Sequence, residues 1–345
     1  MKALVRFDTK PGSLEFQEVP KPAVDDAHAI LRIEAVGICG RDLEHFREVL
    51  DEKKIPFIHG HEFSGTIAEL PDNEKSLKVG DRVTAETVDF VCGECEICKI
   101  GNYNLCKKRK NIGGGMNGAF APFMRAPLSY IHLLPDNISF EEGAMIEPTC
   151  VSYNATLVNS DPKEGELTVI IGAGTVGLLC LQMAKLRGAK VALIGLPVDA
   201  ARMKVGQELG ADYLIDATTD PIRQVLELTG DNGAPLVIDT VGGSSQTIDQ
   251  ALEMVRPGGQ ITKVGWFMKT TNTTLDTLIR KNIRLQGSFS HTREMWKECI
   301  DLISSEKINV KKMISKILPL ENWREGFELG FNREAIKVIL KPQEE

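Results

Sequence analysis

From residue 167 onward, apolar runs of two different periods alternate along the chain. Short β-branched runs predict buried strands, and longer runs with apolar residues three and four positions apart predict helices. The strand-like runs are residues 167–172, 190–195, 213–216, 236–242 and 261–267, and the helical runs are residues 177–188, 200–210, 220–230 and 247–259. Strands that alternate with helices in this way predict a parallel sheet covered by helices on both faces.

The first 150 residues have a different pattern. Short strand-like runs, such as residues 28–38, 63–70 and 80–88, are broken by Gly, Pro and Asp, which predicts an irregular β-rich domain. Near the C-terminus, residues 291–308 predict an amphipathic helix and residues 335–342 a terminal strand. A chain of 345 residues is long enough for two domains, each with its own core.

A glycine motif joins the first predicted parallel strand to the helix that follows it. Gly172, Gly174 and Gly177 have the GxGxxG spacing. In the context of strand, turn and helix, this spacing predicts a dinucleotide site, with the pyrophosphate at the helix N-terminus. The motif also divides the 18 uncharged residues 167–184, so we do not expect them to form a membrane helix.

Composition and charge exclude several classes of partner. The chain is 42% hydrophobic and 26% charged, with a net charge of −7 and a pI of about 5.6, so neither a nucleic acid nor an anionic membrane is an expected partner. The basic run at residues 107–110 predicts a solvated loop. The N-terminus has charges at Arg6 and Asp8 and no apolar signal core. We therefore expect a cytoplasmic protein without disulfides, in which Cys150, Cys180 and Cys299 are small buried residues.

Four of the eight cysteines lie within fifteen residues. Their spacing, Cys92-x2-Cys95-x2-Cys98-x7-Cys106, allows four thiolates to converge on one structural zinc ion. A redox pair would leave two of them unexplained. An iron–sulfur cluster is the main competitor, but bacterial ferredoxin runs typically place the fourth cysteine differently and follow it with proline. Structural zinc is the favoured interpretation.

Other residues of the kinds that bind metal are scattered along the chain. Cys39, the neighbours His61 and Glu62, and Glu147 all belong to this set. Each also has an ordinary explanation, as a core cysteine, a turn histidine or a carboxylate at a helix start. Spacing alone cannot join residues more than a hundred positions apart.

Seven segments along the chain resemble the zinc-containing medium-chain dehydrogenase/reductase family in sequence and in order. They are GICGRD, GHEFSG, VGDRV, CGECEICKIGNYNLC, MIEPTCVSYNA, GAGTVG and the ending IKVIL. The resemblance covers essentially the whole chain and is closest to the polyol branch, the sorbitol-, threonine- and sugar-alcohol-dehydrogenase-like proteins. In that branch, a glutamate followed by proline replaces the third zinc-binding cysteine of classical alcohol dehydrogenases. Here these residues are Glu147 and Pro148.

The resemblance implies an α/β fold with two domains. An irregular β-rich, GroES-like catalytic domain would comprise residues 1–149 and 290–345, with a zinc lobe at about 90–110. A doubly wound Rossmann domain would comprise residues 150–289. The resemblance also implies a homodimer or homotetramer.

The resemblance further implies two zinc ions with separate roles. A catalytic zinc would be held by Cys39, His61 and Glu147, with Glu62 as a switching or fourth ligand and Asp42 orienting His61. The four clustered cysteines would hold a structural zinc, remote from catalysis. The residues expected at the dinucleotide are Gly172, Gly174, Thr175, Val176, Gly177, Pro197, Arg202, Val264 and Ser288.

The implied activity is hydride transfer between NAD(P) and a polyol, sugar alcohol or secondary alcohol, with zinc polarising the substrate oxygen. The alternative is a non-catalytic protein on the same scaffold, crystallin-like or ligand-sensing. The retained set of metal ligands argues against that alternative and against a zinc-free quinone or enone reductase.

The chain departs from the family beside Cys39. Where many relatives carry a Ser or Thr that passes the alcohol proton outward, this chain has Arg41, which cannot relay a proton as a hydroxyl does. Glu44 occupies the position where a relay histidine is common. Arg41 could bind an acidic or polyhydroxylated substrate, or it could simply pair with Glu44.

A second departure concerns the cofactor. NAD enzymes place an acid at the end of the second strand, where it binds the ribose hydroxyls. The matching residue here is Pro197, and the first acid after it is Asp199. Arg202 falls where family members hold the adenosine ribose, and its guanidinium could bind a 2′-phosphate. We therefore expect NADP(H) to be favoured over NAD(H).

Overall fold

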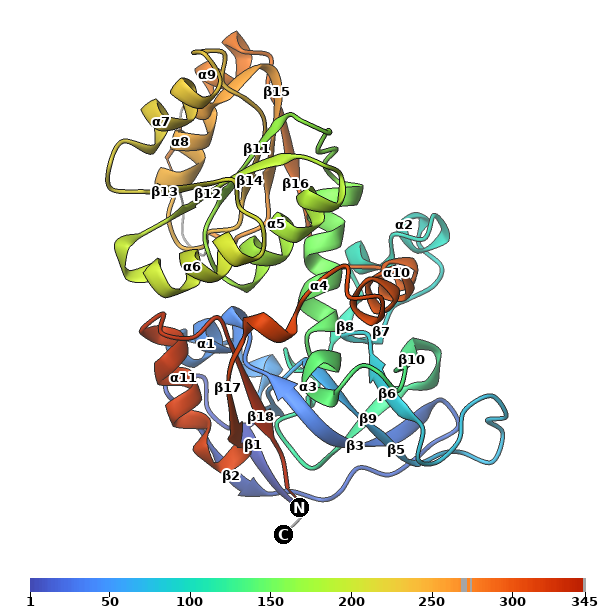
Figure 1. Ribbon diagram of the computed structural model, residues 1–345. Coiled ribbons are helices and arrows are strands. Elements are labelled where there is room, and N and C mark those ends of the chain that lie inside the picture. The colour runs from blue at the N-terminus through green and yellow to red at the C-terminus, as the bar shows by residue number, and fades with distance from the viewer. Residues whose placement is uncertain (268–271, 274, 344–345) are drawn as a thin grey trace. The chain divides into compact units, whose positions relative to one another are not determined.

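The chain divides into two compact units, and no sheet is shared between them (Figure 1). The computed structural model describes residues 1–267, 272–273 and 275–343. The first unit comprises Met1–Glu147, Thr292–Glu306 and Val310–Glu345, and the second comprises Pro148–His291 and Lys307–Asn309.

Six parallel strands form the sheet of the second unit, in the order β13-β12-β11-β14-β15-β16. These strands are β11 (Leu167–Ile171), β12 (Lys190–Gly195), β13 (Tyr213–Asp216), β14 (Ala234–Asp239), β15 (Val255–Lys263) and β16 (Arg284–Gly287). All five residues of β11 are buried, as expected for a strand covered on both faces. This is the strand order of a doubly wound sheet, so the predicted fold class of this unit is confirmed. Its topological switch point lies between β11 and β14.

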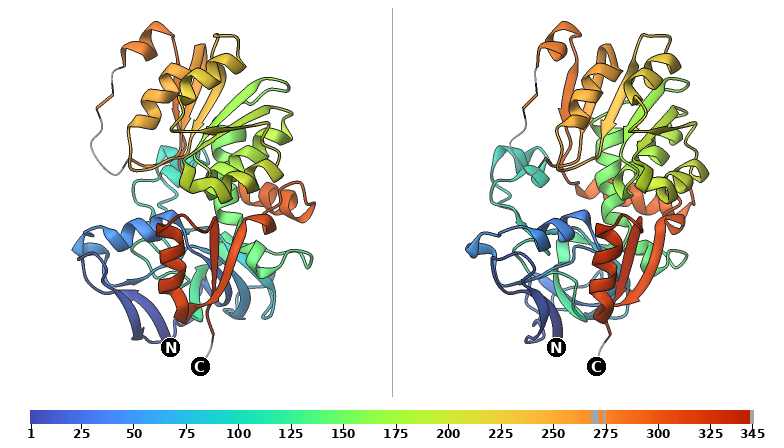
Figure 2. Two further views of the ribbon diagram at one scale, coloured as in Figure 1. Left: turned by 60° about the vertical axis from the view of Figure 1, so that its left-hand side comes forward. Right: turned by 90° about the vertical axis from the view of Figure 1, so that its left-hand side faces the viewer.

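Helices cover both faces of this sheet. They are α5 (Thr175–Leu186), α6 (Ala200–Glu208), α7 (Pro221–Leu228), α8 (Gln246–Met254) and α9 (Asp276–Arg280). Helices α5 and α6 pack on one face, and α7, α8 and α9 lie together on the other (Figure 2). Right-handed crossovers on the two sides of the switch point produce this division.

The helix predicted at residues 247–259 is too long at its C-terminal end. Helix α8 ends at Met254, and Val255 already begins β15. Pro257 cannot donate a helical hydrogen bond and disfavours helical geometry at the residue before it. Gly258 then takes a φ of 69°. The Pro-Gly turn thus belongs to the strand, and β15 ends at Lys263, before the end of the strand predicted at residues 261–267.

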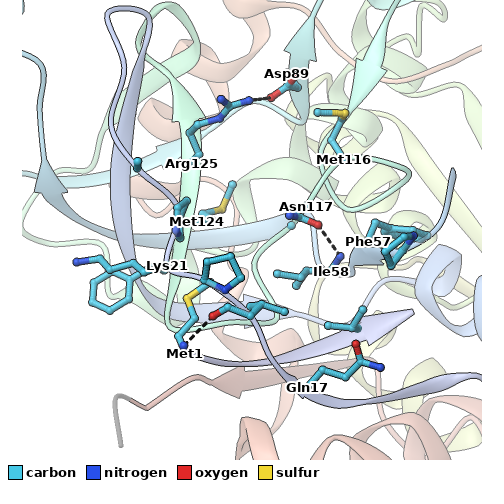
Figure 3. A pocket seen from close by; sticks show the side chains of 18 of the residues that line it. Met1, Gln17, Lys21, Phe57, Ile58, Asp89, Met116, Asn117, Met124 and Arg125 are labelled. Carbon is cyan, nitrogen blue, oxygen red and sulfur yellow. Dashed lines mark hydrogen bonds and ion pairs between the residues drawn. The ribbon is translucent and has the colours of Figure 1, made fainter. Parts of the chain in front are cut away.

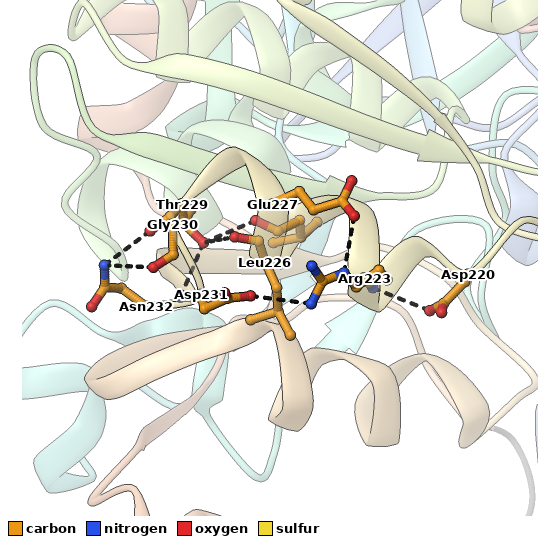
Figure 4. A network of polar contacts seen from close by, with 10 residues as sticks. Asp220, Arg223, Leu226, Glu227, Thr229, Gly230, Asp231 and Asn232 are labelled. Carbon is orange, nitrogen blue, oxygen red and sulfur yellow. Dashed lines mark hydrogen bonds and ion pairs between the residues drawn. The ribbon is translucent and has the colours of Figure 1, made fainter.

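Exposed polar contacts fix the ends of α7 (Figure 4). The Asp220 carboxylate accepts the backbone N–H of Arg223 at 3.1 Å and caps the helix. The Arg223 guanidinium lies 2.9 Å from Glu227 and 3.3 Å from Asp231. Because exposed pairs of this kind contribute only about 0–1 kcal/mol each, we assign this network a local structural role.

The first unit contains two main sheets. The larger, mostly antiparallel sheet has the order β10-β6-β5-β3-β18-β17 with β9 beside β3, and the smaller has the order β2-β1-β4. The strands are β1 (Lys2–Arg6), β2 (Leu14–Glu18), β3 (His28–Gly37), β4 (Phe57–Ile58), β5 (Glu62–Glu69), β6 (Arg82–Ala85), β9 (Phe123–Pro127), β10 (Ile131–Leu133), β17 (Ile314–Pro319) and β18 (Lys337–Lys341), and a separate pair is formed by β7 (Val88–Phe90) and β8 (Lys110–Asn111). The predicted β-rich domain is confirmed.

Short helices and a large apolar core complete this unit. The helices are α1 (Gly40–Arg47), α2 (Glu96–Lys99), α3 (Phe140–Gly143), α10 (Arg293–Ser304) and α11 (Trp323–Phe331). The core includes Leu4, Leu31, Phe63, Phe120 and Phe327, which are almost completely buried. Among the described residues, no helix is both long enough and apolar enough to cross a membrane.

Candidate metal centres and dinucleotide site

Three strands of the first unit bring one group of metal-binding side chains together. Strand β3 ends at Gly37, which pairs with Glu62 of β5 on one side and with Ile339 of β18 on the other. Cys39 follows two residues after β3, and His61 immediately precedes β5. A Cβ atom on Gly37 would lie 2.4 Å from Glu62 Oε2, so only glycine leaves room for this carboxylate.

Cys39, His61 and Glu62 form a mixed donor group. The Cys39 sulfur, a His61 ring nitrogen and a Glu62 carboxylate oxygen all lie within 4.8 Å of one another. Thiolate, imidazole and carboxylate are the ligands that zinc prefers in proteins. Burial and the nearby Glu62 charge raise the pKa of the Cys39 thiol well above its usual value, so metal binding there would displace a proton.

Asp42 links two members of this group to a residue that the sequence did not reveal. Its Oδ2 accepts the backbone N–H of Cys39 at 2.9 Å. Its Oδ1 lies 3.2 Å from His59 Nδ1 and 3.7 Å from His61 Nδ1. Burial alone would raise the pKa of Asp42, but His61 and the hydrogen bond with His59 lower it to about 2. The carboxylate expected to orient His61 is therefore shared with His59.

Lys337 is a second residue that sequence reasoning missed. Its ammonium pairs with Glu62 Oε2 and donates to the Ile38 carbonyl at 3.1 Å. Burial by itself would lower the pKa of Lys337, but Glu62 and Cys39 outweigh it and raise the pKa. A single charge inside the apolar run AIKVIL was the signal available in the sequence.

Glu147 lies near this group without being a member of it. It is buried in the first turn of α4 (Ile146–Tyr153), and its charge acts on Cys39, His61 and Glu62. Among the described residues, however, the set of donor atoms within 4.8 Å of one another does not include it. Its assignment as a zinc ligand stays a prediction.

Arg41 and Glu44 lie on the first turns of α1 and pair with each other. Arg41 Nη1 is 3.1 Å from Glu44 Oε2 and 3.8 Å from Glu48 Oε2. About a third of each of these side chains is exposed, 34%, 37% and 32% respectively. Pairing was one of the two predicted roles of Arg41, and contact with substrate stays a prediction.

The four clustered cysteines form a second group. Cys92 Sγ lies 3.9 Å from Cys98 Sγ and 3.6 Å from Cys106 Sγ, and all four sulfurs lie within 4.8 Å of one another. A tetrahedral zinc ion with bonds of about 2.3 Å separates its sulfurs by about 3.8 Å. An iron–sulfur cluster binds its cysteines through different irons and would spread them further apart. The backbone N–H groups of Cys95 and Glu94 lower the pKa of Cys92 to about 6, whereas desolvation raises the pKa of Cys98 to about 12, so a thiolate is favoured at Cys92.

A buried carboxylate connects this lobe to the rest of the first unit. Glu86 is fully buried between β6 and β7. Its Oε2 accepts the Tyr103 hydroxyl at 2.5 Å, and its Oε1 lies 3.2 Å from His132 Nε2 and 3.6 Å from Arg293 Nε. Because residues 80–88 predicted one unbroken strand-like run, this break and its buried acid were not foreseen.

The solvated-loop prediction for residues 107–110 is wrong for Arg109. Its Nη1 donates to the Asn104 carbonyl at 3.3 Å, and its Nη2 donates to Thr87 Oγ1 at 3.1 Å. Lys108 is exposed, as predicted. Arg109 is the member of the run that turns toward the protein, where it bonds Thr87, the residue just before β7.

The glycine motif of the second unit lies at the switch point of the sheet. Gly172 takes a φ of 108° after β11, and Gly174 caps α5, which then begins with Thr175 and Val176. A Cβ atom on Gly177 would lie 1.8 Å from the Gly172 carbonyl oxygen, whereas one on Gly174 would meet no atom within 4 Å. The third glycine thus permits close packing, and the second leaves open space, as a pyrophosphate at the helix N-terminus requires.

The end of β12 carries an internal ion pair. Pro197 begins a short 3₁₀ turn, and Asp199 Oδ2 accepts the backbone N–H of Leu196 at 3.2 Å. Asp199 Oδ1 lies 3.3 Å from Arg202 Nη1, and both side chains are largely buried. Arg202, predicted to meet a phosphate, is therefore already beside a carboxylate.

The two other residues predicted at the dinucleotide follow neighbouring strands. Val264 comes directly after β15 and donates its N–H to the Asp239 carbonyl at 2.9 Å. Ser288 comes directly after β16 and accepts from Asn159 Nδ2 at 3.1 Å. Both stand at the carboxyl edge of the sheet, the same edge as the glycine motif.

A separate cavity of about 630 Å³ lies in the first unit (Figure 3). Its walls are mostly apolar and include Met1, Phe57 and Met116. Arg125 at its margin is 3.7 Å from Asp89. None of the predicted metal ligands lines it.

Comparison with known proteins places these features in a family. Residues 25–136 match the model of the alcohol dehydrogenase GroES-like domain, and residues 175–305 match that of the zinc-binding dehydrogenase domain. The chain is 36% identical to a D-arabitol-phosphate dehydrogenase of Enterococcus avium, over 96% of this chain and 95% of that protein. It is 34% identical to a sorbitol dehydrogenase of Halalkalibacterium halodurans, over 99% of each. The crystal structure of galactitol-1-phosphate dehydrogenase from Escherichia coli superimposes with a TM-score of 0.89 at 26% identity, covering 99% of this chain and 100% of that one.

Proposed function

This chain belongs to the family of zinc-binding dehydrogenases, and we propose that it transfers a hydride between a polyol or polyol phosphate and a nicotinamide dinucleotide. The grouping of the Cys39, His61 and Glu62 donor atoms within 4.8 Å carries the proposal. The named substrates of the similar proteins (arabitol phosphate, sorbitol and galactitol 1-phosphate) supply the substrate class.

We propose two zinc ions per chain. Cys39, His61 and Glu62, with Glu147 beside them, would hold the catalytic ion, and the four cysteines of the lobe would hold the structural one. When bound, the catalytic zinc supplies a Lewis acid for the substrate oxygen, and the nicotinamide accepts the hydride.

The chain's own residues hold the donors and set the charge around them. The carboxylates of Asp42, Glu62 and Glu147 act on His61, and the Lys337 ammonium opposes them. This excess of negative charge favours a divalent cation. The Asp42 carboxylate accepts the N–H of Cys39, and Lys337 restrains Glu62. Both contacts fix the donors before any metal arrives.

For the dinucleotide, we propose that NADP(H) is preferred over NAD(H) by about tenfold or less. The Pro197 side chain has no acceptor for the ribose hydroxyls and no negative charge, so the usual penalty against a 2′-phosphate is missing. The Arg202 guanidinium would attract the phosphate, but the neighbouring Asp199 at 3.3 Å offsets part of that attraction. Because of this offset, we expect only a small preference for NADP(H) over NAD(H).

We also propose that the protein is a homodimer or homotetramer in the cytoplasm. None of the eight cysteines is joined in a disulfide, which agrees with a reducing compartment. Light scattering on the purified protein tests the oligomeric state, and a monomeric mass would refute it.

The test of function is a substrate screen on zinc-loaded protein. Free polyols, polyol phosphates, sugar acids and simple secondary alcohols would be offered with NAD and with NADP, while the absorbance of the reduced nicotinamide is followed. We expect the highest kcat/KM for a polyol or a polyol phosphate, and the two arms distinguish these classes. A protein that oxidises none of them, or prefers the simple alcohols, contradicts the proposal.

Two variants provide controls for this screen. Cys39→Ala should remove turnover with every substrate, because it removes a donor of the catalytic group. Arg202→Ala should reduce kcat/KM with NADP and leave NAD nearly unchanged. An equal loss with both cofactors would refute the proposed preference.

A further inference from the structure

His59 stands beside the catalytic group without belonging to it. Its side chain is fully buried, and its Nδ1 lies 3.2 Å from Asp42 Oδ1. His61, the expected metal ligand, lies further from the same oxygen, at 3.7 Å. Of these two imidazoles, His59 is therefore the one that forms a hydrogen bond with Asp42.

The aromatic surroundings of His59 leave it one polar contact. Its ring stacks on Phe57 at 4.7 Å and lies 6.4 Å from the Phe120 ring, while His45 meets it edge-on at 5.6 Å. Within the described part of the chain, His59 Nε2 is buried and has no hydrogen-bond partner. A carboxylate can only accept, so Nδ1 carries the proton that bonds Asp42.

An unpaired buried acceptor is costly. Leaving a nitrogen such as Nε2 unsatisfied costs about 1–3 kcal/mol. A leucine at position 59 would fill a similar volume among the aromatic rings without that cost. The chain nevertheless keeps an imidazole there, so the contact that offsets the cost is the one with Asp42.

Asp42 is the residue through which His59 can act on the metal site. One carboxylate oxygen accepts the N–H of Cys39 and the other faces both histidines. Gly60, between the two histidines, has a φ of 90°, and a Cβ atom there would lie 2.6 Å from the Phe120 ring. The backbone thus holds both imidazoles against one carboxylate.

We propose that His59 is a positioning residue for the catalytic metal group: its Nδ1–H fixes Asp42, which in turn accepts the backbone N–H of Cys39 and faces the His61 ring at 3.7 Å. The inference rests on the proposed function, since it requires zinc at this group. Loss of a partner behind a metal ligand typically costs about 10–100-fold in metal affinity or activity. We expect the effect of His59 in that range.

Three variants separate positioning from packing. His59→Leu keeps the bulk and removes the donor. His59→Asn keeps an N–H donor near the position of Nδ1, and His59→Gln moves the donor toward the position of Nε2, away from Asp42. His132→Leu is the matched control, because His132 is another buried histidine on a carboxylate, 3.2 Å from Glu86.

The principal readout is the release of zinc from the zinc-loaded protein to a chromogenic chelator, with kcat and thermal unfolding measured in parallel. We expect His59→Leu and His59→Gln to release the zinc of the Cys39 group about 10–100 times faster and to lose kcat by a similar factor. His59→Asn should stay close to the native rate. Release from the four-cysteine lobe, an internal control, should not change in any His59 variant, and His132→Leu should leave release from the Cys39 group unchanged.

Three different results would overturn the inference, and they can be distinguished from one another. If the native protein binds two zinc ions and His59→Leu releases both at native rates, His59 does not position the group, while the proposed function stands. If the native protein binds no zinc at the Cys39 group, the proposed function fails, and the inference fails with it. Equal acceleration in the Leu and Asn variants would indicate lost ring packing and would also refute the proposed hydrogen-bond mechanism.

Discussion

The two candidate metal-binding groups are built in different ways, although both lie in the first unit. The four cysteines occupy fifteen residues, from Cys92 to Cys106, and between them lie only a four-residue helix and a 3₁₀ turn. Cys39, His61 and Glu62 are instead brought together by β3, β5 and β18. A local group depends on its ion for rigidity, whereas a group held by a sheet is shaped by the fold itself.

This difference predicts opposite results when one ligand is removed, and these are the largest effects that we expect. Cys39→Ala should lower kcat/KM by about a thousandfold or more, because a metal Lewis acid contributes several kcal/mol to catalysis. Its thermal unfolding should change little. Cys95→Ala should lower the unfolding temperature strongly, because a structural zinc contributes folding free energy. Elemental analysis should find about one zinc ion fewer in each variant.

The comparison fails if the two variants behave alike. A Cys39→Ala protein that unfolds as readily as Cys95→Ala would mean that the fold does not hold the mixed group without its ion. Iron in the native protein, or a single zinc ion, would also contradict the assignment of two separate zinc sites.

The second prediction concerns the buried ion pair behind the mixed group. Lys337→Met leaves the Glu62 carboxylate buried without its partner and should cost about 3–5 kcal/mol of unfolding free energy. Lys341, on the same strand, pairs with Glu141 at 2.8 Å and is 42% exposed. Lys341→Met should therefore cost about 0–1 kcal/mol. Denaturant unfolding of zinc-free protein measures the free energy of unfolding of both variants. If the two variants lose the same free energy, the buried pair of Lys337 is no more important for stability than the exposed pair of Lys341.

The same difference explains what the sequence could predict. The four-cysteine group was predictable because its ligands are local and their spacing is enough. Five of the six strands of the parallel sheet were predictable because apolar runs alternate with helical ones. Strand β16 was not predicted, because its sequence RLQG is neither an apolar run nor buried. The mixed group could be assembled only by resemblance, because no local pattern joins Cys39 to Glu147 across the fold.

His59, Lys337 and Glu86 were missed for a related reason. Each is a polar residue buried by strands or loops that are distant in the sequence, and burial of this kind follows from tertiary packing. Lys337 has its partner 275 positions away, and Glu86 meets Arg293 from α10. For Arg109, the neighbouring lysines suggested solvent exposure, and only the fold shows which member of the run turns inward.

The third prediction tests how the lobe is anchored. Tyr103→Phe removes the hydrogen bond to Glu86 and should cost about 1.5–3 kcal/mol, since the acceptor is a buried carboxylate. Tyr130 is the matched control, because its ring lies 5.9 Å from that of Tyr103 and its hydroxyl has no hydrogen bond among the described residues. Tyr130→Phe should cost less than about 0.5 kcal/mol. Denaturant unfolding measures both, and release of the lobe zinc to a chelator should be faster only in Tyr103→Phe.

The smallest expected effect lies at the rim of the mixed group. The Arg41–Glu44 pair is about one third exposed, so Arg41→Ser should change the unfolding free energy by less than about 1 kcal/mol. If Arg41 also contacts substrate, the variant should raise KM for a polyol phosphate much more than for a simple secondary alcohol, because only the charged substrate loses a charge-assisted hydrogen bond. Glu44→Gln is the control, since it breaks the pair and keeps the guanidinium. If Arg41→Ser changes KM equally for both substrates, and Glu44→Gln changes it by the same amount, the role of Arg41 is the ion pair and not substrate contact. Substrate selection would then be determined by other residues.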